Sequence, residues 1–342
     1  MKRYLLFCLF ILTFFSVILY RISTRTAITM PNGIWPWILT KTQEYCGASS
    51  LARTAATASL PVMFMETTET LTPHALAICS VESTARIYQD RPVQFYLRGF
   101  KNRSCLQSET ECPGLRVLTD FPNVQLIHLN PKEVLKGTPL ATWYNEDKVY
   151  KAGQWIRITS DAYRLALMWK TGGLYFDTDV IITKKVPIKD FVVCEEDNSV
   201  ATAAFGFPQQ HPYIMDLMVD FILNYNPDIW GQQGPRLFTR IMKKSCPLPH
   251  FGKVQDFPCD ALNVTIMHPV RFYPIHWSEW GKYLEVWKEI PAFENSYGLH
   301  FWFHMSGNDK RAVVLGSNTL EENLFIKYCP NTYAALIKKV KV

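Results

Sequence analysis

Largely apolar residues run from residue 4 to residue 20, with no charged residue among them. Lys2 and Arg3 precede this run, and Arg21 follows it. Its length is at the lower limit for a helix that crosses a bilayer, and basic flanks are typical of membrane boundaries. The alternative, a cleaved signal peptide, is disfavoured because the run is long and no small-x-small site follows it. We predict a transmembrane signal-anchor over 4–20 behind a cytoplasmic tail of residues 1–3.

Beyond the anchor, the polar and apolar pattern changes at about residue 59. Residues 21–58 are rich in Ser, Thr and Ala without a sustained apolar period, which predicts a lumenal stem. The remainder, 59–342, is expected to form one lumenal domain. Its early part alternates apolar strands with an amphipathic helix, and this βαβ rhythm predicts an α/β, Rossmann-like sheet. The strands are expected at 61–66, 92–97 and 124–129, with the helix at 73–88 and a surface loop at 98–121.

Composition and charge narrow the class of protein. The chain has 342 residues, of which 14% are aromatic and 19% charged, as in ordinary globular enzymes. A formal net charge of +6 would suit an anionic partner. However, the lysines occur as scattered pairs such as 184–185 and 243–244 rather than as one basic stripe. We therefore predict no nucleic-acid partner.

Cysteine usage agrees with an oxidising lumen. Of nine cysteines, Cys8 lies in the predicted anchor, and the other eight permit up to four disulfides. Cys105 with Cys112, and Cys246 with Cys259, are the closest couples along the chain, but spacing leaves the pairing open. No CxxC pair occurs, so zinc is not expected.

Two N-x-S/T sequons also suit a lumenal chain. They begin at Asn102 and Asn263, and we predict that both asparagines are glycosylated.

The stretch from residue 160 to 183 carries the candidate chemistry. Ser160 is a suitable N-cap, and the apolar stripe that follows predicts a helix over 161–171. Gly172 and Gly173 would end it, leaving 174–183 as a buried strand.

Two carboxylates lie within this predicted strand. Residues i and i+2 of a strand share a face with Cα atoms ~6.6 Å apart, so Asp177 and Asp179 can converge on one hard cation. The chain has neither GxGxxG nor GxxxxGK[ST], so a phosphate-bearing ligand would need such a cation. On the preceding helix, Asp161 and Arg164 share a face, although such a pair by itself is typical of a surface ion pair.

Taken together, these residues resemble a known family. The pattern S-D-x-x-R followed by W-K-x-G-G-x-Y-x-D-x-D is similar to the DxD glycosyltransferases of the Golgi, which include α-1,4-N-acetylglucosaminyl- and α-1,4-galactosyltransferases, with more distant kinship to yeast mannosyltransferases and glucosylating toxins. Further matches are F-M-E-T-T at 64–68, C-S-V-E-S at 79–83, T-P-L-A-x-W-Y at 138–144, W-G-x-Q-G-P at 230–235, F-Y-P-I at 272–275 and G-S-N-T-L at 316–320. The last match is closer to the N-acetylglucosaminyl branch.

The resemblance implies a GT-A-like fold, a UDP-sugar donor, Mn²⁺ or Mg²⁺, and transfer with retention of configuration. Asp177 and Asp179 would hold the metal and the diphosphate, and Asp179 would thereby act in catalysis. The donor-binding residues would be Asp161, Arg164, Tyr175 and Asp177. Gln233 resembles the amide placed beside the anomeric carbon, and its alternative role is a turn before Pro235.

Two histidines near the C-terminal end are further candidates. In an alternating strand His300 and His304 would face one way, so either imidazole could complete the metal shell, and we assign His300 to it. Packing is the simpler role for His304. The family pattern reads H-x-W-N, whereas Phe303 stands at the asparagine position of this chain.

The resulting hypothesis is a Golgi membrane enzyme that transfers N-acetylglucosamine with retention onto the terminal β-galactose of a glycoprotein or glycolipid glycan. The alternatives are an α-1,4-galactosyltransferase acting on glycolipid and a non-catalytic, cation-dependent sugar-binding protein, the latter favoured by Phe303. A glycoside hydrolase is disfavoured, because its two carboxylates must flank the scissile bond rather than crowd together.

Overall fold

The computed structural model describes residues 59–108, 110–146, 154–306 and 312–338. The predicted anchor at 4–20 and stem at 21–58 lie outside these ranges. Within them, every helix is too short or too polar to span a membrane.

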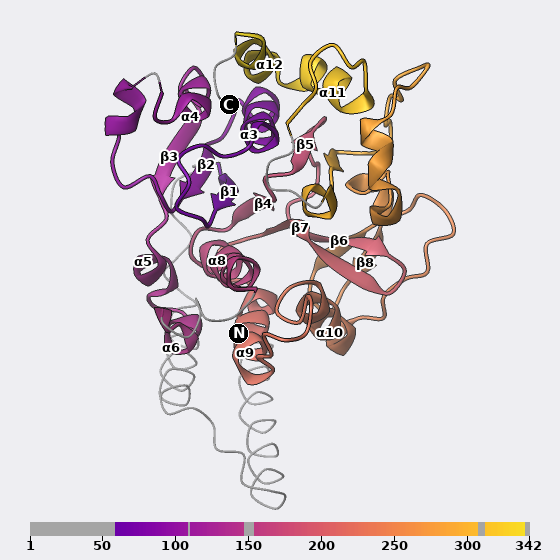
Figure 1. The fold of residues 1–342 in the computed structure, drawn as a ribbon. Coiled ribbons are helices and arrows are strands. Elements are labelled where there is room, and N and C mark those ends of the chain that lie inside the picture. Colours follow the sequence, from indigo (N-terminus) through magenta and orange to yellow (C-terminus); the bar gives the residue numbers. More distant parts are fainter. Residues whose placement is uncertain (1–58, 109, 147–153, 307–311, 339–342) are drawn as a thin grey trace, which may run out of the picture. The chain divides into compact units, whose positions relative to one another are not determined.

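A mixed sheet of eight strands forms the centre of this domain, in the order β3-β2-β1-β4-β7-β6-β9-β8 (Figure 1). The parallel half contains β1 (Val62–Glu66), β2 (Val93–Leu97), β3 (Val124–His128) and β4 (Gly173–Phe176). The other half contains β6 (Phe191–Glu196), β7 (Ser199–Phe207), β8 (Phe257–Cys259) and β9 (Val264–Met267). Within it β7 is antiparallel to both β4 and β6, while β9 is parallel to β6. The predicted strands at 61–66, 92–97 and 124–129 are confirmed as β1, β2 and β3.

Helices cover both faces of the sheet (Figure 1). On one side are α5 (Pro131–Leu135), α6 (Leu140–Trp143), α8 (Trp155–Thr171), α9 (Pro212–Leu223) and α10 (Pro235–Ser245). On the other are α3 (Ala75–Ile87), α4 (Pro113–Leu118), α11 (Leu320–Tyr328) and α12 (Pro330–Ile337). Side chains alternate accordingly, so Met63 and Tyr175 pack toward α8 while Phe64 and Phe176 pack toward α3.

A second, two-stranded sheet pairs β5 (Val180–Ile182) with β10 (Gly298–His300). Short 3₁₀ segments complete the described fold: η1 (Ser104–Gln107), η2 (Pro269–Arg271), η3 (Trp277–Leu284) and η4 (Phe303–Ser306). The surface loop predicted at 98–121 is wrong in part, because α4 buries Leu115 and Leu118 within it. A helix of this length has too few turns for its apolar period to be recognised.

Cysteine pairing is now defined for the described residues. The disulfides are Cys105–Cys112, Cys246–Cys259 and Cys79–Cys329, the last joining α3 to the start of α12. Cys194 is buried as a free thiol, and burial raises its pKa to about 12. Cys46 lies outside the described ranges.

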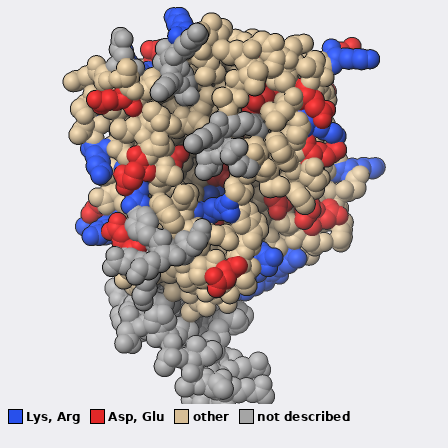
Figure 2. Space-filling model, viewed as in Figure 1, with Lys and Arg blue, Asp and Glu red and all other residues tan. Residues whose placement is uncertain are grey.

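Figure 2 shows how the charged side chains are distributed on one face of the molecule. On the face shown in Figure 2, basic and acidic side chains are interspersed, and neither sign forms a continuous patch.

Candidate active site

The Asp177-Thr178-Asp179 segment forms a turn at the carboxyl end of β4. The Asp177 amide donates to the Ala203 carbonyl at 2.8 Å, and the Val180 amide donates to the Asp177 carbonyl at 3.2 Å. The chain then leaves the main sheet, because β5 pairs with β10. The single strand predicted over 174–183 is therefore wrong. Because β5 is apolar like β4, the sequence pattern reads as one continuous strand and gives no sign of the turn between them.

The end of the preceding helix was predicted correctly. Gly172 and Gly173 adopt φ values of 65° and 114° after Thr171. A Cβ atom on Gly173 would lie 2.2 Å from the Pro61 carbonyl oxygen, so the strand can start there only with glycine. This pair sets where β4 begins and thus where its carboxyl end falls.

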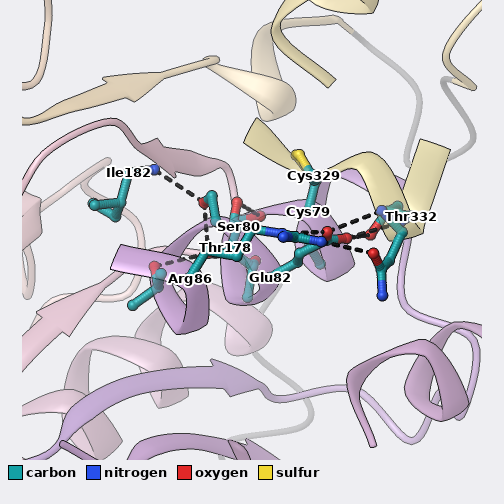
Figure 3. Close-up of a disulfide and its surroundings, with 12 residues drawn as sticks. Cys79, Ser80, Glu82, Arg86, Thr178, Ile182, Cys329 and Thr332 are labelled. Carbon is teal, nitrogen blue, oxygen red and sulfur yellow. Dashed lines mark hydrogen bonds and ion pairs between the residues drawn. A yellow bond between two sulfur atoms is a disulfide. The ribbon is translucent and has the colours of Figure 1, made fainter. Parts of the chain in front are cut away.

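Two serines of helix α3 hydrogen-bond the Asp177-Thr178-Asp179 turn and the strand that follows it (Figure 3). The Ser80 hydroxyl donates to the Thr178 carbonyl at 2.9 Å, and the Ser83 hydroxyl accepts from the Ile182 amide at 3.1 Å. Both serines are buried. The C-S-V-E-S motif thus supports the turn that carries Asp177 and Asp179.

Asp177, Asp179 and His300 converge on one point. Each offers one ligand atom, and these atoms lie within 4.8 Å of one another. His300 Nε2 is 3.2 Å from Asp179 Oδ1, while Asp179 Oδ2 accepts the Phe303 amide at 3.0 Å. The buried Nδ1 of His300 has no hydrogen-bond partner among the described residues. Two carboxylates with one imidazole fit a divalent cation of the manganese type.

Asp179 and His300 shift each other's pKa values. Burial by itself would raise the pKa of Asp179, but His300, the Phe303 amide and His74 together outweigh it and lower that pKa to about 2. Conversely, burial disfavours the charged imidazole, yet Asp179 raises the pKa of His300 above its usual value. A metal ligand must be a neutral imidazole, so a cation and a proton would compete for His300.

Asp161 and Arg164 join the cluster from helix α8. Arg164 has a side chain only 7% exposed, lying 3.5 Å from Asp161 and 3.3 Å from Asp177. It also donates to the Thr202 carbonyl at 2.7 Å. The surface ion pair considered from the sequence is therefore wrong. The pair is buried and links the helix to the carboxylate turn.

Helix α8 begins at Trp155, earlier than predicted. Ser160 lies inside the helix, where its hydroxyl accepts from Arg164 Nη2 at 3.0 Å instead of capping the helix. The apolar side chain of Ile158 faces the core, so the buried stripe extends toward the N-terminus beyond Ser160. This extension brings Arg157 onto the same face as Asp161.

Tyr175 supports Asp177 from within the core. It is 1% exposed, and its hydroxyl donates to Asp177 Oδ1 at 2.6 Å. The Arg164 guanidinium lies 4.9 Å above its ring. These contacts orient the carboxylate, whereas direct contact of Tyr175 with a donor stays a prediction.

Asp161 lies where α8 meets the loop before α10. Burial raises its pKa to about 6, and Arg164 offsets part of this effect. Gly234 packs so closely that an added Cβ atom would lie 2.8 Å from Asp161 Oδ2. Asp161 and the 226–234 loop are therefore held together.

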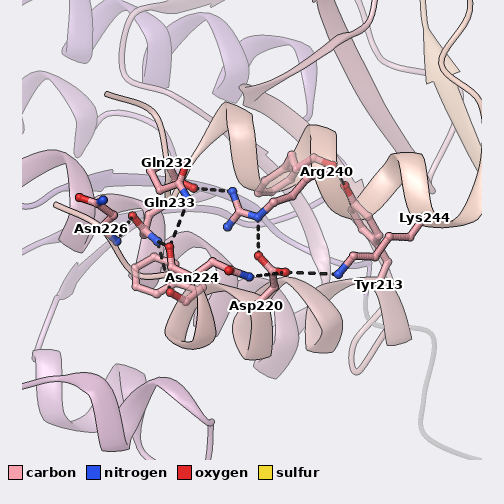
Figure 4. Close-up of polar contacts among 10 residues, drawn as sticks. Tyr213, Asp220, Asn224, Asn226, Gln232, Gln233, Arg240 and Lys244 are labelled. Carbon is pink, nitrogen blue, oxygen red and sulfur yellow. Dashed lines mark hydrogen bonds and ion pairs between the residues drawn. The ribbon is translucent and has the colours of Figure 1, made fainter. Parts of the chain in front are cut away.

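Gln233 is engaged by its own loop (Figure 4). Its Nε2 donates to the Phe221 carbonyl at 3.2 Å and the Asn224 carbonyl at 3.0 Å, while its Oε1 accepts from the Asn226 amide at 3.4 Å. The side chain is 2% exposed. These contacts give the amide a structural role in the loop, and its predicted catalytic role stays a prediction.

His304 lies apart from the metal cluster. β10 ends at His300, Trp302 has a φ of 53°, and the chain continues into η4, so the alternating strand expected here is absent. His304 stacks on Trp230 at a centroid distance of 5.6 Å. The expectation that both histidines face one way is wrong.

Tyr273, in the F-Y-P-I motif, was not assigned a role from the sequence. Its ring meets His300 edge-on at 5.4 Å, and its buried hydroxyl has no hydrogen-bond partner among the described residues. The only signal was its place in a family motif, since an apolar neighbourhood gives a lone tyrosine no distinguishing pattern.

A cavity of about 250 Å³ lies at the same edge of the sheet, where β1, β2 and β3 end. Its lining comprises Glu69, Arg98, Lys101, His128, Leu129, Asn130, Pro131, Lys132, Tyr144 and Glu146. Carboxyl ends of parallel strands are the usual nucleotide-binding edge of α/β sheets. The cavity and the carboxylate turn thus share one edge of the fold.

Comparisons with known proteins agree with this geometry. Residues 74–200 match the glycosyltransferase sugar-binding region containing the DXD motif, and residues 206–336 match the α-1,4-glycosyltransferase conserved region. The DXD region implies a divalent cation and a nucleotide-sugar donor. Among solved structures, the PaToxG glycosyltransferase aligns with a TM-score of 0.42 and 17% identity, over 61% of this chain and 76% of that one.

Curated relatives are much closer. The human α-1,4-N-acetylglucosaminyltransferase is 43% identical over 81% of this chain and 81% of its own length. The human lactosylceramide 4-α-galactosyltransferase is 35% identical over 80% of this chain and 77% of its own. Both alignments span most of each protein. The chain therefore belongs to the α-1,4-glycosyltransferase family and is a DXD glycosyltransferase.

Proposed function

We propose that this chain is a retaining α-1,4-N-acetylglucosaminyltransferase of the GT-A type, which transfers the sugar from its UDP donor to the 4-hydroxyl of a terminal β-galactose. The observation that carries this proposal is the convergence of Asp177, Asp179 and His300, joined through Arg164 to Asp161. The choice of donor rests on the 43% identity to the N-acetylglucosaminyl relative.

Each residue of the cluster has a distinct task in this proposal. Asp177, Asp179 and His300 would hold manganese, which neutralises charge on the diphosphate as UDP departs. Tyr175 and Arg164 keep Asp177 oriented through the contacts described above. Asp161 presents a carboxyl at the edge of the site, 14% exposed, where it can contact a donor hydroxyl. The acceptor hydroxyl and the departing phosphate would meet on one face of the sugar, so no carboxylate nucleophile is required.

The donor is tested by a panel of UDP-sugars. The lumenal segment, with manganese and a β-galactoside acceptor, is expected to use UDP-N-acetylglucosamine at least about tenfold better than UDP-galactose, since a pocket complementary to one sugar loses about 1.4 kcal/mol or more with another. Turnover is measured as UDP release. Exclusive use of UDP-galactose would refute the donor assignment and leave the enzyme class intact.

For location, we propose a single-pass type II protein of the Golgi membrane with its catalytic domain in the lumen. Support comes from the apolar run at 4–20 and from the sequons at Asn102 and Asn263, both of which are exposed. The disulfides of the domain suit an oxidising compartment.

Glycosidase treatment checks this topology. Removal of N-linked glycans from the full chain, made in secretory cells, should increase its gel mobility, because lumenal exposed sequons are glycosylated. Asn263→Gln and Asn102→Gln should each remove one step of the shift. A wild-type mobility unchanged by the glycosidase would count against a lumenal domain.

A further inference from the structure

Trp230 is a large apolar side chain that stays exposed beside the active site. It lies in the loop between α9 and α10, and 52% of its surface is accessible. Tryptophan is enriched at binding interfaces, because its indole offers a large apolar surface together with one polar N–H group.

The indole ring is held in place although it is exposed. The Arg157 guanidinium lies 4.0 Å from the ring centroid, and the His304 ring stacks at 5.6 Å with an interplanar angle of 21°. Arg157 Nη2 is also 2.7 Å from His304 Nδ1. Contacts from helix α8 and from η4 thus fix the orientation of a ring carried by a third segment. A ring fixed in this way loses little conformational entropy when a ligand binds.

Arg157, His304 and the loop that carries Trp230 each lie next to a residue of the candidate active site. Arg157 precedes Asp161 by one helical turn on α8. Gly234, in the loop that carries Trp230, packs against Asp161. His304 follows Phe303, whose amide binds Asp179. Trp230 is therefore connected through its neighbours both to Asp161 and to Asp179.

The residues around Trp230 indicate which substrate group it contacts: the nucleotide, the donor sugar or the acceptor sugar. The cavity at the ends of β1, β2 and β3 lies at the edge where α/β sheets usually bind nucleotides, and the Asp161 carboxyl, 14% exposed, can contact a donor hydroxyl. Trp230 is the exposed aromatic side chain of the loop that packs against Asp161 through Gly234. The apolar face of a pyranose, formed by its ring C–H groups, stacks well on such a ring.

We propose that Trp230 is the platform on which the terminal galactose of the acceptor stacks, with Arg157 and His304 as positioning residues that hold the indole. The inference rests on the proposed function, because it takes the acceptor to end in galactose. The platform orients the sugar so that its 4-hydroxyl faces the donor held at Asp161.

Kinetics of Trp230 variants test this directly. Trp230→Ala should raise the KM for lactose on the order of tenfold, the loss of one stacking contact, while the KM for UDP-N-acetylglucosamine changes by less than about twofold. Trp230→Phe should restore most of the acceptor affinity. Trp277→Ala is the matched control, since Trp277 is 42% exposed and lies in η3. An unchanged lactose KM, or a rise confined to the donor KM, would overturn the assignment.

A binding experiment separates this inference from the proposed function. Saturation-transfer NMR with lactose, UDP and manganese reports acceptor contact without turnover. If no UDP-sugar is turned over but lactose binds to wild type and not to Trp230→Ala, the platform stands and the proposed activity fails. If turnover is as proposed and lactose binds equally to both proteins, the platform fails alone.

Discussion

Asp179→Asn is expected to lower turnover by about three orders of magnitude, because the neutral amide weakens cation binding where charge develops on the departing diphosphate. Asp179 contributes one oxygen to the cluster with Asp177 and His300. Turnover is measured as UDP release at saturating donor and manganese. Asp260→Asn, on an exposed aspartate, is the matched control and should leave the rate unchanged.

Thermal unfolding of the same variant distinguishes loss of the site from loss of the fold. Manganese with UDP should raise the Tm of wild type, since a ligand that binds only the native state stabilises it, and should leave the Tm of Asp179→Asn nearly unchanged. A variant with wild-type turnover, or a wild-type enzyme fully active in excess chelator, would contradict a cation at this cluster.

Glu82→Ala is expected to lower the free energy of unfolding by about 3–5 kcal/mol, the usual cost of breaking a buried, charged network. Glu82 is fully buried on α3 and ion-paired to Arg86 at 2.8 Å. Its carboxylate accepts the Asn331 amide at 2.9 Å, and the Thr332 amide and hydroxyl at 2.7 Å each (Figure 3). The substitution leaves the first donors of α12 buried without an acceptor.

Denaturant unfolding with the disulfides intact measures this effect. The Cys79–Cys329 disulfide keeps α3 and α12 joined, so the variant should fold and report the lost contacts. Glu82→Gln, which keeps one acceptor oxygen, should be affected less, and Glu289→Ala on the exposed surface should be nearly neutral. A loss below about 1 kcal/mol for Glu82→Ala would show that the network is not stabilising.

Local patterns predicted much of the parallel half of the fold. β1, β2 and β3 are short apolar runs bounded by turn residues, and the apolar run of α3 is too long for a typical strand, so each can be recognised without its neighbours. The mixed half has no such signal, because the pairing of β7 between β4 and β6 depends on contacts far apart in sequence. Likewise, nothing local reveals that Cys79 pairs with Cys329.

The residues of the site were predicted better than their geometry. Spacing and resemblance identified Asp177, Asp179 and His300, and the structure brings them together. The apolar run after Gly173 suggested a single strand, whereas the Val180 amide donates to the Asp177 carbonyl and the Ser80 hydroxyl donates to the Thr178 carbonyl, so the chain turns there. The only sequence signal for Trp230 was its place at the start of the W-G-x-Q-G-P match, because exposure beside a site is a property of the folded chain.

The G-S-N-T-L segment, whose match is closer to the N-acetylglucosaminyl branch, has a structural role. Thr319 caps α11, and the Glu322 carboxylate accepts the Asn318 amide at 2.6 Å and the Tyr333 hydroxyl at 2.8 Å. The G-S-N-T-L match therefore reflects a helix start, and donor choice must be measured at the site.

NMR of the product formed from UDP-N-acetylglucosamine and lactose tests the proposed reaction most directly. The expected product carries N-acetylglucosamine on the 4-oxygen of galactose, with the small H1–H2 coupling of an α-anomer and a cross-peak from its H1 to galactose C4. A large, β-type coupling would contradict retention, and a cross-peak to another galactose carbon would contradict the 4-linkage.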